Sequence, residues 1–172
     1  MRRKQIKNTT PKPESPPEPA SEFIVRVNRS IKPTYPADWF KKLMHPDLAL
    51  AGPAEYDLQA DVYEWLHDDQ KDDGDVEGII IYDRLKEDKA LASCLNLQDG
   101  LAIQAMDIAV YRKLFARKTV VLWGSVAQDH QNNLRVPHLF EFKDRDRDMV
   151  VVRWRWLASN FYSRSPALRF IK

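Results

Sequence analysis

The pattern of hydrophobic and polar positions divides the chain into a helical part and a stranded part. Apolar residues recur at three- and four-residue spacings over 54–66 and 99–116, which predicts amphipathic helices. Between 119 and 157, three apolar runs separated by polar loops are typical of strands. We therefore predict an α+β fold, with a mostly helical N-terminal half packed on a C-terminal three-stranded antiparallel meander.

The helices are expected within about 36–116. A short strand over 22–29 precedes them, because "EFIVRVNR" alternates and is β-branched. Pro36 and Asp38 can open the first helix, and Pro46 would end it. Asp75 is expected to be the N-cap of a later helix. The predicted helices cover 36–45, 54–66, about 76–88 and about 99–116, the last of these central because it is apolar on two sides.

The antiparallel sheet is expected over about 119–157. Six-residue connections, "QDHQNN" and "KDRDRD", suit hairpins between its strands. The segment 158–172 is rich in aromatic residues and should pack back onto the sheet. The predicted strands cover 119–127, 134–142 and 149–157.

Side chains alternate between the two faces of a strand, and this alternation predicts the register of the last two strands. Phe140 should lie opposite Val152 or Trp154, because a slip by one residue would place the tryptophans opposite Arg135. We predict that the side of the sheet that carries Trp154 and Trp156 is buried, with both tryptophans in the core. The predicted outer face is solvated and carries Arg135, Glu141, Arg153 and Arg155, with Glu141 opposite Arg153 in one register.

The first residues differ in composition from the rest. Residues 1–22 are basic at the start and then rich in proline, which predicts a disordered tail. Residues 23–172 then form a single α+β domain. No apolar run is long enough to span a membrane, and no secretory signal is present, so the cytoplasm is the expected location. The single cysteine, Cys94, excludes an internal disulfide and lies in an apolar setting typical of a buried, inert thiol.

Charge is distributed unevenly along the chain. Residues 1–12 hold five Lys/Arg and no Asp/Glu, and residues 143–172 hold eight against three. Residues 13–142 hold 14 Lys/Arg against 22 Asp/Glu, and the whole chain has a net charge of +2. Basic ends around an acidic middle either neutralise one another or meet an external anion.

Arginines on the outer sheet face and in the adjoining loop indicate a binding function. Guanidinium groups bind phosphate and carboxylate through paired hydrogen bonds. Three loop aspartates, Asp144, Asp146 and Asp148, oppose this field. We predict a non-enzymatic binding protein whose partner is a nucleic-acid backbone or an acidic protein surface. The candidate binding residues are Arg2, Arg3, Lys4, Arg135, Arg145, Arg147, Arg153 and Arg155.

Two alternative functions follow from other residues. An acidic surface over residues 55–77 could dock a basic partner, as in an accessory or inhibitor protein. Asp129 and the "EFK" of Glu141 and Lys143 resemble part of the core of metal-dependent nucleases of the D…(D/E)-x-K type, although no "PD" precedes them. A calcium loop at 69–80 is excluded because Ile80 stands where a glutamate is needed. No cofactor, resident metal or membrane partner is expected.

Overall fold

The structure, a computed structural model, describes residues 21–145 and 147–171, and strands outweigh helices in it. Eleven strands account for 34% of the described part and 25% of it is helical, with only three short α-helices. The predicted helical N-terminal half is therefore wrong, and the sheet is not confined to the C-terminal half. Among the described residues, no helix is both long and apolar enough to cross a membrane.

Two strands dominate the fold. β8 (Leu134–Asp144) and β9 (Arg147–Trp156) hold 11 and 10 residues, whereas no other strand in the described part exceeds four. The remaining strands are β1 (Ile24–Arg26), β2 (Phe40–Leu43), β3 (Glu55–Asp57), β4 (Val62–Trp65), β5 (Asp75–Glu77), β6 (Val120–Val121), β7 (Ala127–Asp129), β10 (Asn160–Tyr162) and β11 (Ala167–Phe170). Short 3₁₀ turns cover Pro46–Leu48, Asp68–Gln70, Leu91–Ser93 and Trp123–Ser125.

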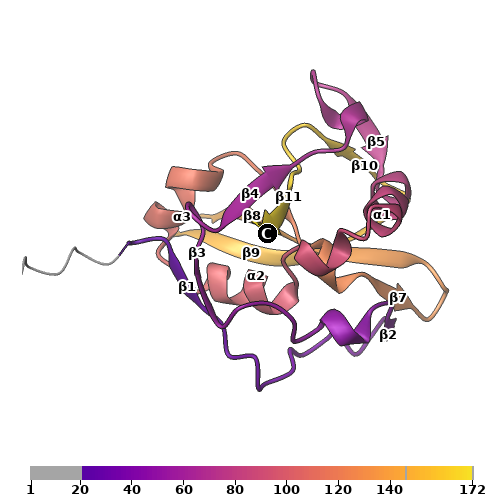
Figure 1. Cartoon of the computed structure of the whole chain (residues 1–172), viewed down its shortest axis with the longest axis horizontal. Helices are drawn as coiled ribbons and strands as arrows, with labels where there is room; N and C mark the ends of the chain where they lie inside the picture. The colour runs from indigo at the N-terminus through magenta and orange to yellow at the C-terminus, as the bar shows by residue number, and fades with distance from the viewer. Residues whose placement is uncertain (1–20, 146, 172) are drawn as a thin grey trace, which may run out of the picture.

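The main sheet joins segments from both halves of the chain (Figure 1). Its strand order is β2-β7-β8-β6-β11-β4, with β9 on the free side of β8, and β1–β3 and β5–β10 form two small sheets. The segments predicted as helices over 36–45 and 54–66 are strands, because their hydrogen-bond partners lie far away in the sequence. β2 pairs with β7 and β4 pairs with β11. The segment 158–172 does not pack onto the sheet. It supplies two strands, β11 in the main sheet and β10 in a small one.

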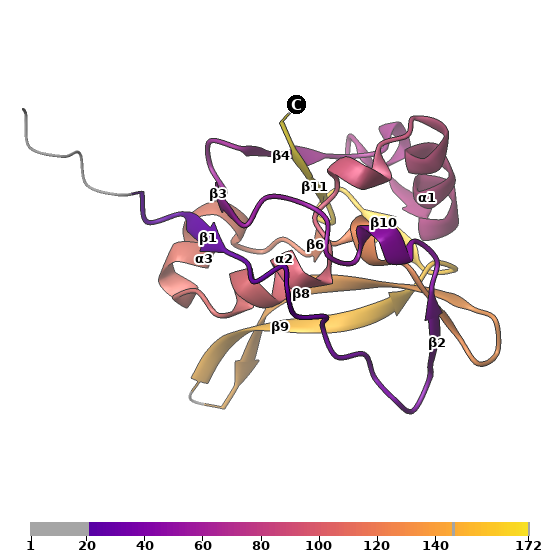
Figure 2. The same cartoon turned by 60° about the horizontal axis from the view of Figure 1, so that its bottom comes forward.

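The three α-helices are α1 (Gly78–Glu87), α2 (Leu97–Gln104) and α3 (Ile108–Phe115). The predicted helix over 99–116 is two helices, because Asp107 caps α3 by accepting a hydrogen bond from the amide of Ala109. The predicted N-cap Asp75 belongs to β5, and Glu77 precedes α1 instead. In Figure 2, β8 and β9 run as a long ribbon below α2.

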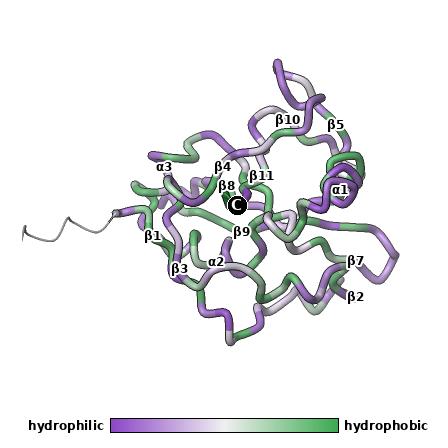
Figure 3. Tube along the Cα trace, in the orientation of Figure 1, coloured by the Kyte–Doolittle hydropathy of each residue, from purple (hydrophilic) through white to green (hydrophobic). Residues whose placement is uncertain are grey.

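Two hydrophobic cores lie on opposite sides of the β8–β9 ribbon. One contains Leu139 and Val150 packed against α2 and α3, including Ile103 and Tyr111. The other contains Val136 with residues of α1, and Trp123 is its fully buried indole. Figure 3 shows hydrophobic segments crossing the middle of the molecule and a hydrophilic loop leading into β5. Both sides of β8 are therefore buried, though at different points along the strand.

The register of β8 and β9 differs from the prediction by one residue. Phe140 lies opposite Val151, and Trp156 lies opposite Arg135, which is the slip that the sequence disfavoured. Glu141 faces Val150 and does not face Arg153. The prediction assumed one buried face, but Val136 and Leu139, which are three residues apart and point to opposite sides, are both fully buried. Burial on two sides removes the pattern on which the register argument rested.

The predicted burial of the two tryptophans is wrong for Trp156, which is 52% exposed. Trp154 is half-buried and packs against Trp39, with ring centroids 5.1 Å apart. Arg153 is exposed, as predicted, whereas Arg155 is half-buried. The reason is again the register, which places Trp156 opposite Arg135 and Trp154 opposite Pro137, on the side of the ribbon away from Phe140 and Phe142.

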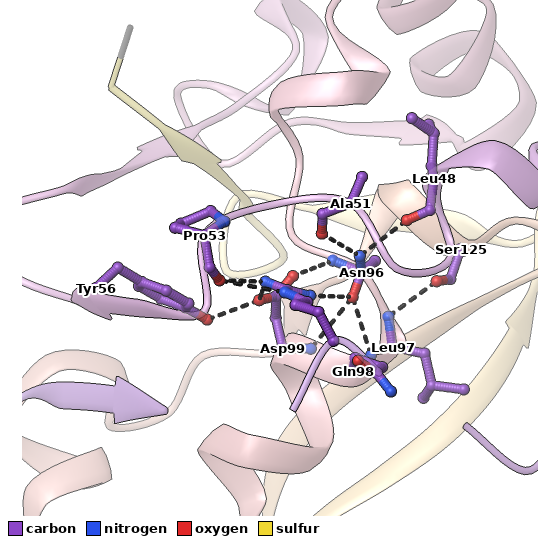
Figure 4. Close-up of polar contacts among 10 residues, drawn as sticks. Leu48, Ala51, Pro53, Tyr56, Asn96, Leu97, Gln98, Asp99 and Ser125 are labelled. Carbon is purple, nitrogen blue, oxygen red and sulfur yellow. Dashed lines mark hydrogen bonds and ion pairs between the residues drawn. The ribbon is translucent and has the colours of Figure 1, made fainter. Parts of the chain in front are cut away.

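A buried polar network fixes the start of α2 (Figure 4). Asn96 caps the helix, and its side-chain amide donates to the carbonyls of Leu48 and Ala51 at 2.9 and 3.0 Å. Asp99 is fully buried and pairs with Arg29 at 2.5 Å. Tyr56 donates its hydroxyl to the same carboxylate at 3.1 Å. These contacts tie the loop around residue 50 to the helix that supports β9.

Candidate anion-binding face

One side of the β8–β9 ribbon carries aromatic and cationic side chains that belong to neither core. Leu139 and Val150 point to α2 and α3, so alternation directs Phe140 and Val151 to the opposite side. Phe142 and Met149 face each other two positions further along, on the same side. We call this side the arginine–aromatic face and define it as Phe140, Phe142, Met149, Val151 and Arg153.

Arg153 is the exposed cation of this face. Its guanidinium carbon lies 5.4 Å from the ring centroid of Phe140 and 5.3 Å from that of Phe142. Among the described residues, no carboxylate forms an ion pair with Arg153. Cation–π contacts orient the guanidinium without neutralising it. Its hydrogen-bond donors therefore remain available to an external anion.

His138 lies opposite Arg153 and beside Phe140, with the two rings stacked at a centroid distance of 5.4 Å. Burial, with the nearby charges of Arg155 and Arg153, lowers the pKa of His138 to about 4. The imidazole is therefore neutral at neutral pH. Arg155 lies 4.8 Å from the ring centroid of Phe161 and donates to the carbonyl of Asn160 at 2.7 Å. His138 therefore adds no positive charge beside Phe140, and the charge on this side of the ribbon comes from Arg153 and Arg155.

The carboxylates of the ribbon mostly lie on the other side. Arg112 of α3 donates hydrogen bonds to Glu141 and, at 2.5 Å, to Asp148. The bond from Arg112 lowers the pKa of Asp148, which keeps that carboxylate charged and paired. Asp144, opposite Arg147 at the tip, is the carboxylate that alternation places on the aromatic side. The ribbon therefore separates its charges, with paired acids toward the helices and Arg153 outward.

A basic pocket adjoins Phe140 at the edge of β8. β6 pairs with β8 only at His138 and Leu139, so within the described residues this edge is unpaired from Phe140 onward. The pocket has a volume of about 370 Å³ and is lined by Arg117, Lys118, Thr119, Phe140, Glu141 and Lys143. Lys118 is paired with Glu64 at 2.6 Å, whereas Arg117 and Lys143 are exposed.

The structure brings some of the predicted arginines together and separates others. Arg147, Arg153 and Arg155 share one side of β9, and Arg145 is exposed in the turn at the tip. Arg135 lies on the opposite side, between the rings of Trp39 and Trp156 at 4.5 and 5.1 Å. The candidate arginines of the sheet and its loop (Arg135, Arg145, Arg147, Arg153 and Arg155) therefore do not share one surface. Arg2, Arg3 and Lys4 lie outside the described residues.

The residues of the nuclease alternative do not meet. Asp129 accepts hydrogen bonds from the amides of Gln131 and Asn133, as a turn-stabilising carboxylate does. Glu141 is six residues beyond the point where β7 ends its pairing with β8, or about 20 Å along the strand. Within the described residues, no group of three or more metal-ligating side chains is placed to hold an ion.

The acidic segment 55–77 contributes three strands and the exposed loop that leads into β5. Gln70 is buried and anchors this loop by donating to the carbonyls of Tyr162 and Ser165 at 3.0 and 3.2 Å. Lys71 pairs with Asp68 at 2.7 Å. These contacts give the loop a structural role in joining β4 to β5.

Sequence reasoning missed the two phenylalanines of the face, because the register it expected placed Phe140 opposite Val152 or Trp154 on the buried side of the sheet. It also missed Arg117, which lies outside any predicted strand. The signal that could have found the phenylalanines is the one-residue register shift. Protein-family models, curated proteins and solved structures gave no match to this chain.

Proposed function

We propose that this chain is a non-enzymatic binding protein that holds the phosphate backbone of a nucleic acid on its arginine–aromatic face. The observation that supports this proposal is the separation of charge across the β8–β9 ribbon. Arg112 pairs with both Glu141 and Asp148 on one side, while Arg153 has no carboxylate partner among the described residues on the other. An arginine without a carboxylate partner can bind phosphate through paired hydrogen bonds.

The surroundings of Arg153 extend the basic surface in two directions. Arg147 and Arg145 continue it to the tip of the hairpin, and the pocket beside Phe140 adds Arg117 and, from the other side of β8, Lys143. The basic residues Arg2, Arg3 and Lys4 remain predicted contributors. A backbone contact of this kind supplies affinity without reading sequence.

A salt series tests the proposal. Binding of the full-length chain to labelled DNA and RNA of mixed sequence is followed by fluorescence anisotropy at increasing salt. The logarithm of the association constant is expected to fall linearly with the logarithm of the salt concentration, with a slope near −0.7 to −0.9 per phosphate contact. Arg153→Ala and Arg147→Ala should each weaken binding and reduce the slope by about one contact.

Arg84→Ala is the matched control, because Arg84 is an exposed arginine on α1 that pairs with Asp88 at 2.9 Å. It should leave affinity and slope unchanged. An absence of binding at low salt, or binding that does not respond to salt, would overturn the proposal. Binding to an acidic protein surface but to neither nucleic acid would replace it with the other anionic partner.

A further inference from the structure

We infer, resting on the proposed function, that the nucleic acid is single-stranded and that its bases stack on Phe140 and Phe142. The two rings are half-buried and belong to neither hydrophobic core of the described residues. Aromatic side chains on an open sheet surface present faces to which an unpaired base can add. A protein that contacts only the phosphate backbone does not need exposed aromatic rings.

The geometry of the two rings favours unpaired bases. Their centroids are 6.5 Å apart and their planes are perpendicular. Bases inside a duplex are parallel and covered by their neighbours, so they cannot reach two rings set at right angles. Bases of a single strand can be splayed apart, and each can meet one ring.

Arg153 lies where the phosphate between two such bases would pass. Its guanidinium rests over both rings in the free protein, at almost equal distances of 5.4 and 5.3 Å. A base that stacks on a ring takes the place of the guanidinium, which then turns to the adjacent phosphate. His138 lies beside Phe140 on the same side of β8 and holds its ring by stacking on it at an angle of 22°.

The pocket beside Phe140 gives the strand a direction. It borders Phe140 on the side away from β9 and exposes Arg117 and Lys143. Its volume of about 370 Å³ lies in the range of sites that hold small ligands, roughly 300–1,000 Å³. A phosphate or a terminal nucleotide following the base on Phe140 fits this position.

The test compares single strands with a duplex on the full-length chain. Labelled oligothymidylate, oligouridylate and a mixed-sequence duplex of equal length are titrated at one low salt concentration. Phe140→Leu and Phe142→Leu keep an apolar side chain but remove the ring. Each is expected to weaken single-strand binding by about 5- to 150-fold, since stacking on one aromatic ring contributes roughly 1–3 kcal/mol per base and about 1.4 kcal/mol is tenfold. Duplex binding should not change.

Tyr162→Leu is the control, because Tyr162 is an aromatic residue of β10 that is 51% exposed and remote from the face in the pairing order. It should change neither affinity. Thermal melting of each variant shows whether it is folded. If single strands and duplex bind equally and the phenylalanine variants alter neither, stacking is excluded while the proposed function stands. If no nucleic acid binds at all, the proposed function itself has failed.

Discussion

Asp99 is a fully buried carboxylate held by three different groups. Arg29 pairs with it at 2.5 Å, the amide of Asn96 donates at 2.9 Å and the hydroxyl of Tyr56 donates at 3.1 Å. Burial raises the pKa of Asp99, and the hydrogen bonds and the charge of Arg29 act in the opposite direction. The carboxylate therefore depends on its partners, since a buried charge without them is costly.

Arg29→Ala is expected to destabilise the fold by about 3–5 kcal/mol, because it leaves Asp99 buried and unpaired by any cation. The control is Arg26→Ala, since the ion pair of Arg26 with Glu55 joins side chains that are 73% and 57% exposed. That variant should lose less than about 1 kcal/mol. Urea unfolding followed by circular dichroism measures both. Equal losses would show that the Asp99 network does not hold α2 in place.

His138 should make stability depend on pH. Its pKa is about 4 in the folded protein, below the value of about 6.5 in an unfolded chain, so the unfolded state takes up the proton first. The contribution of His138 is complete above about pH 6.5 and is lost as the pH falls toward 4, by up to about 3 kcal/mol.

The measurement is urea unfolding of the wild type and His138→Gln at about pH 7.5 and about pH 4.5. The wild type should lose more stability than the variant between these values. Part of the wild-type loss will remain in the variant, because burial also lowers the pKa of His45. His130→Gln, in the exposed turn after β7, serves as the control and should behave as the wild type does. Identical losses in wild type and His138→Gln would contradict the assignment.

At the scale of elements, the register of the β8–β9 hairpin decides which side chains form the candidate site. In the structure Lys143 lies opposite Asp148. We expect Lys143→Cys combined with Asp148→Cys to form a disulfide on mild oxidation, because side chains directly opposite in an antiparallel pair are close enough to be joined. Asp144→Cys with Asp148→Cys, which would be opposite in the register expected from the sequence, should form it poorly.

Mass spectrometry of the oxidised protein under denaturing conditions distinguishes the two pairs. The native Cys94 does not interfere, since it is buried and burial raises the pKa of its thiol to about 12. More efficient linkage of the 144–148 pair would restore the tryptophan-inward register and remove Phe140 from the arginine–aromatic face.

Element boundaries were predictable from the sequence where local signals are strong. The long strands β8 and β9 lie close to the predicted 134–142 and 149–157, and α1 lies within the predicted 76–88. β2, β3 and β4 were not predictable, because three or four residues carry no period that separates strand from helix. Their identity comes from partners that a local pattern cannot show.

The candidate site was predictable in its arginines and not in its aromatic rings. Arg153 and Arg155 share a side because they are two residues apart in one strand, which is a local fact. Their position relative to Phe140 depends on pairing between two strands. The sequence could not predict that pairing, because β8 has apolar residues on both sides. Val136 and Leu139, which point to opposite sides, are both buried. Arg135 was misplaced for the same reason.

At the scale of the molecule, the N-terminal strands depend on the end of the chain. β11 pairs with β4 and β6, and β10 pairs with β5. Leu168 is fully buried in the same core as residues of α2 and α3. Among the strands described, β1 and β3 pair with each other, whereas β4 and β5 pair only with strands from the end of the chain.

A chain ending at Ala158 is expected not to fold, because β4 and β5 lose their partners, β6 loses one of its two, and Leu168 leaves the core. Dispersion of amide signals in a ¹H–¹⁵N correlation spectrum measures this outcome. The full-length Tyr162→Ala variant is the control, since its side chain is exposed and it should keep the wild-type spectrum. A truncated chain with dispersed signals would indicate an N-terminal unit that folds independently.

The pairing of Glu141 and Asp148 with Arg112 has a consequence for how an anion arrives. A polyanion approaching over α3 meets two acids and one guanidinium, whereas one approaching the opposite side of the ribbon meets Arg153 first. Such a field orients the encounter before any contact forms, within the roughly 10 Å over which charges act at about 0.1 M salt. Removing Arg112 would expose two negative charges only one sheet thickness behind the rings. Association would then slow even though no residue that touches the ligand had changed.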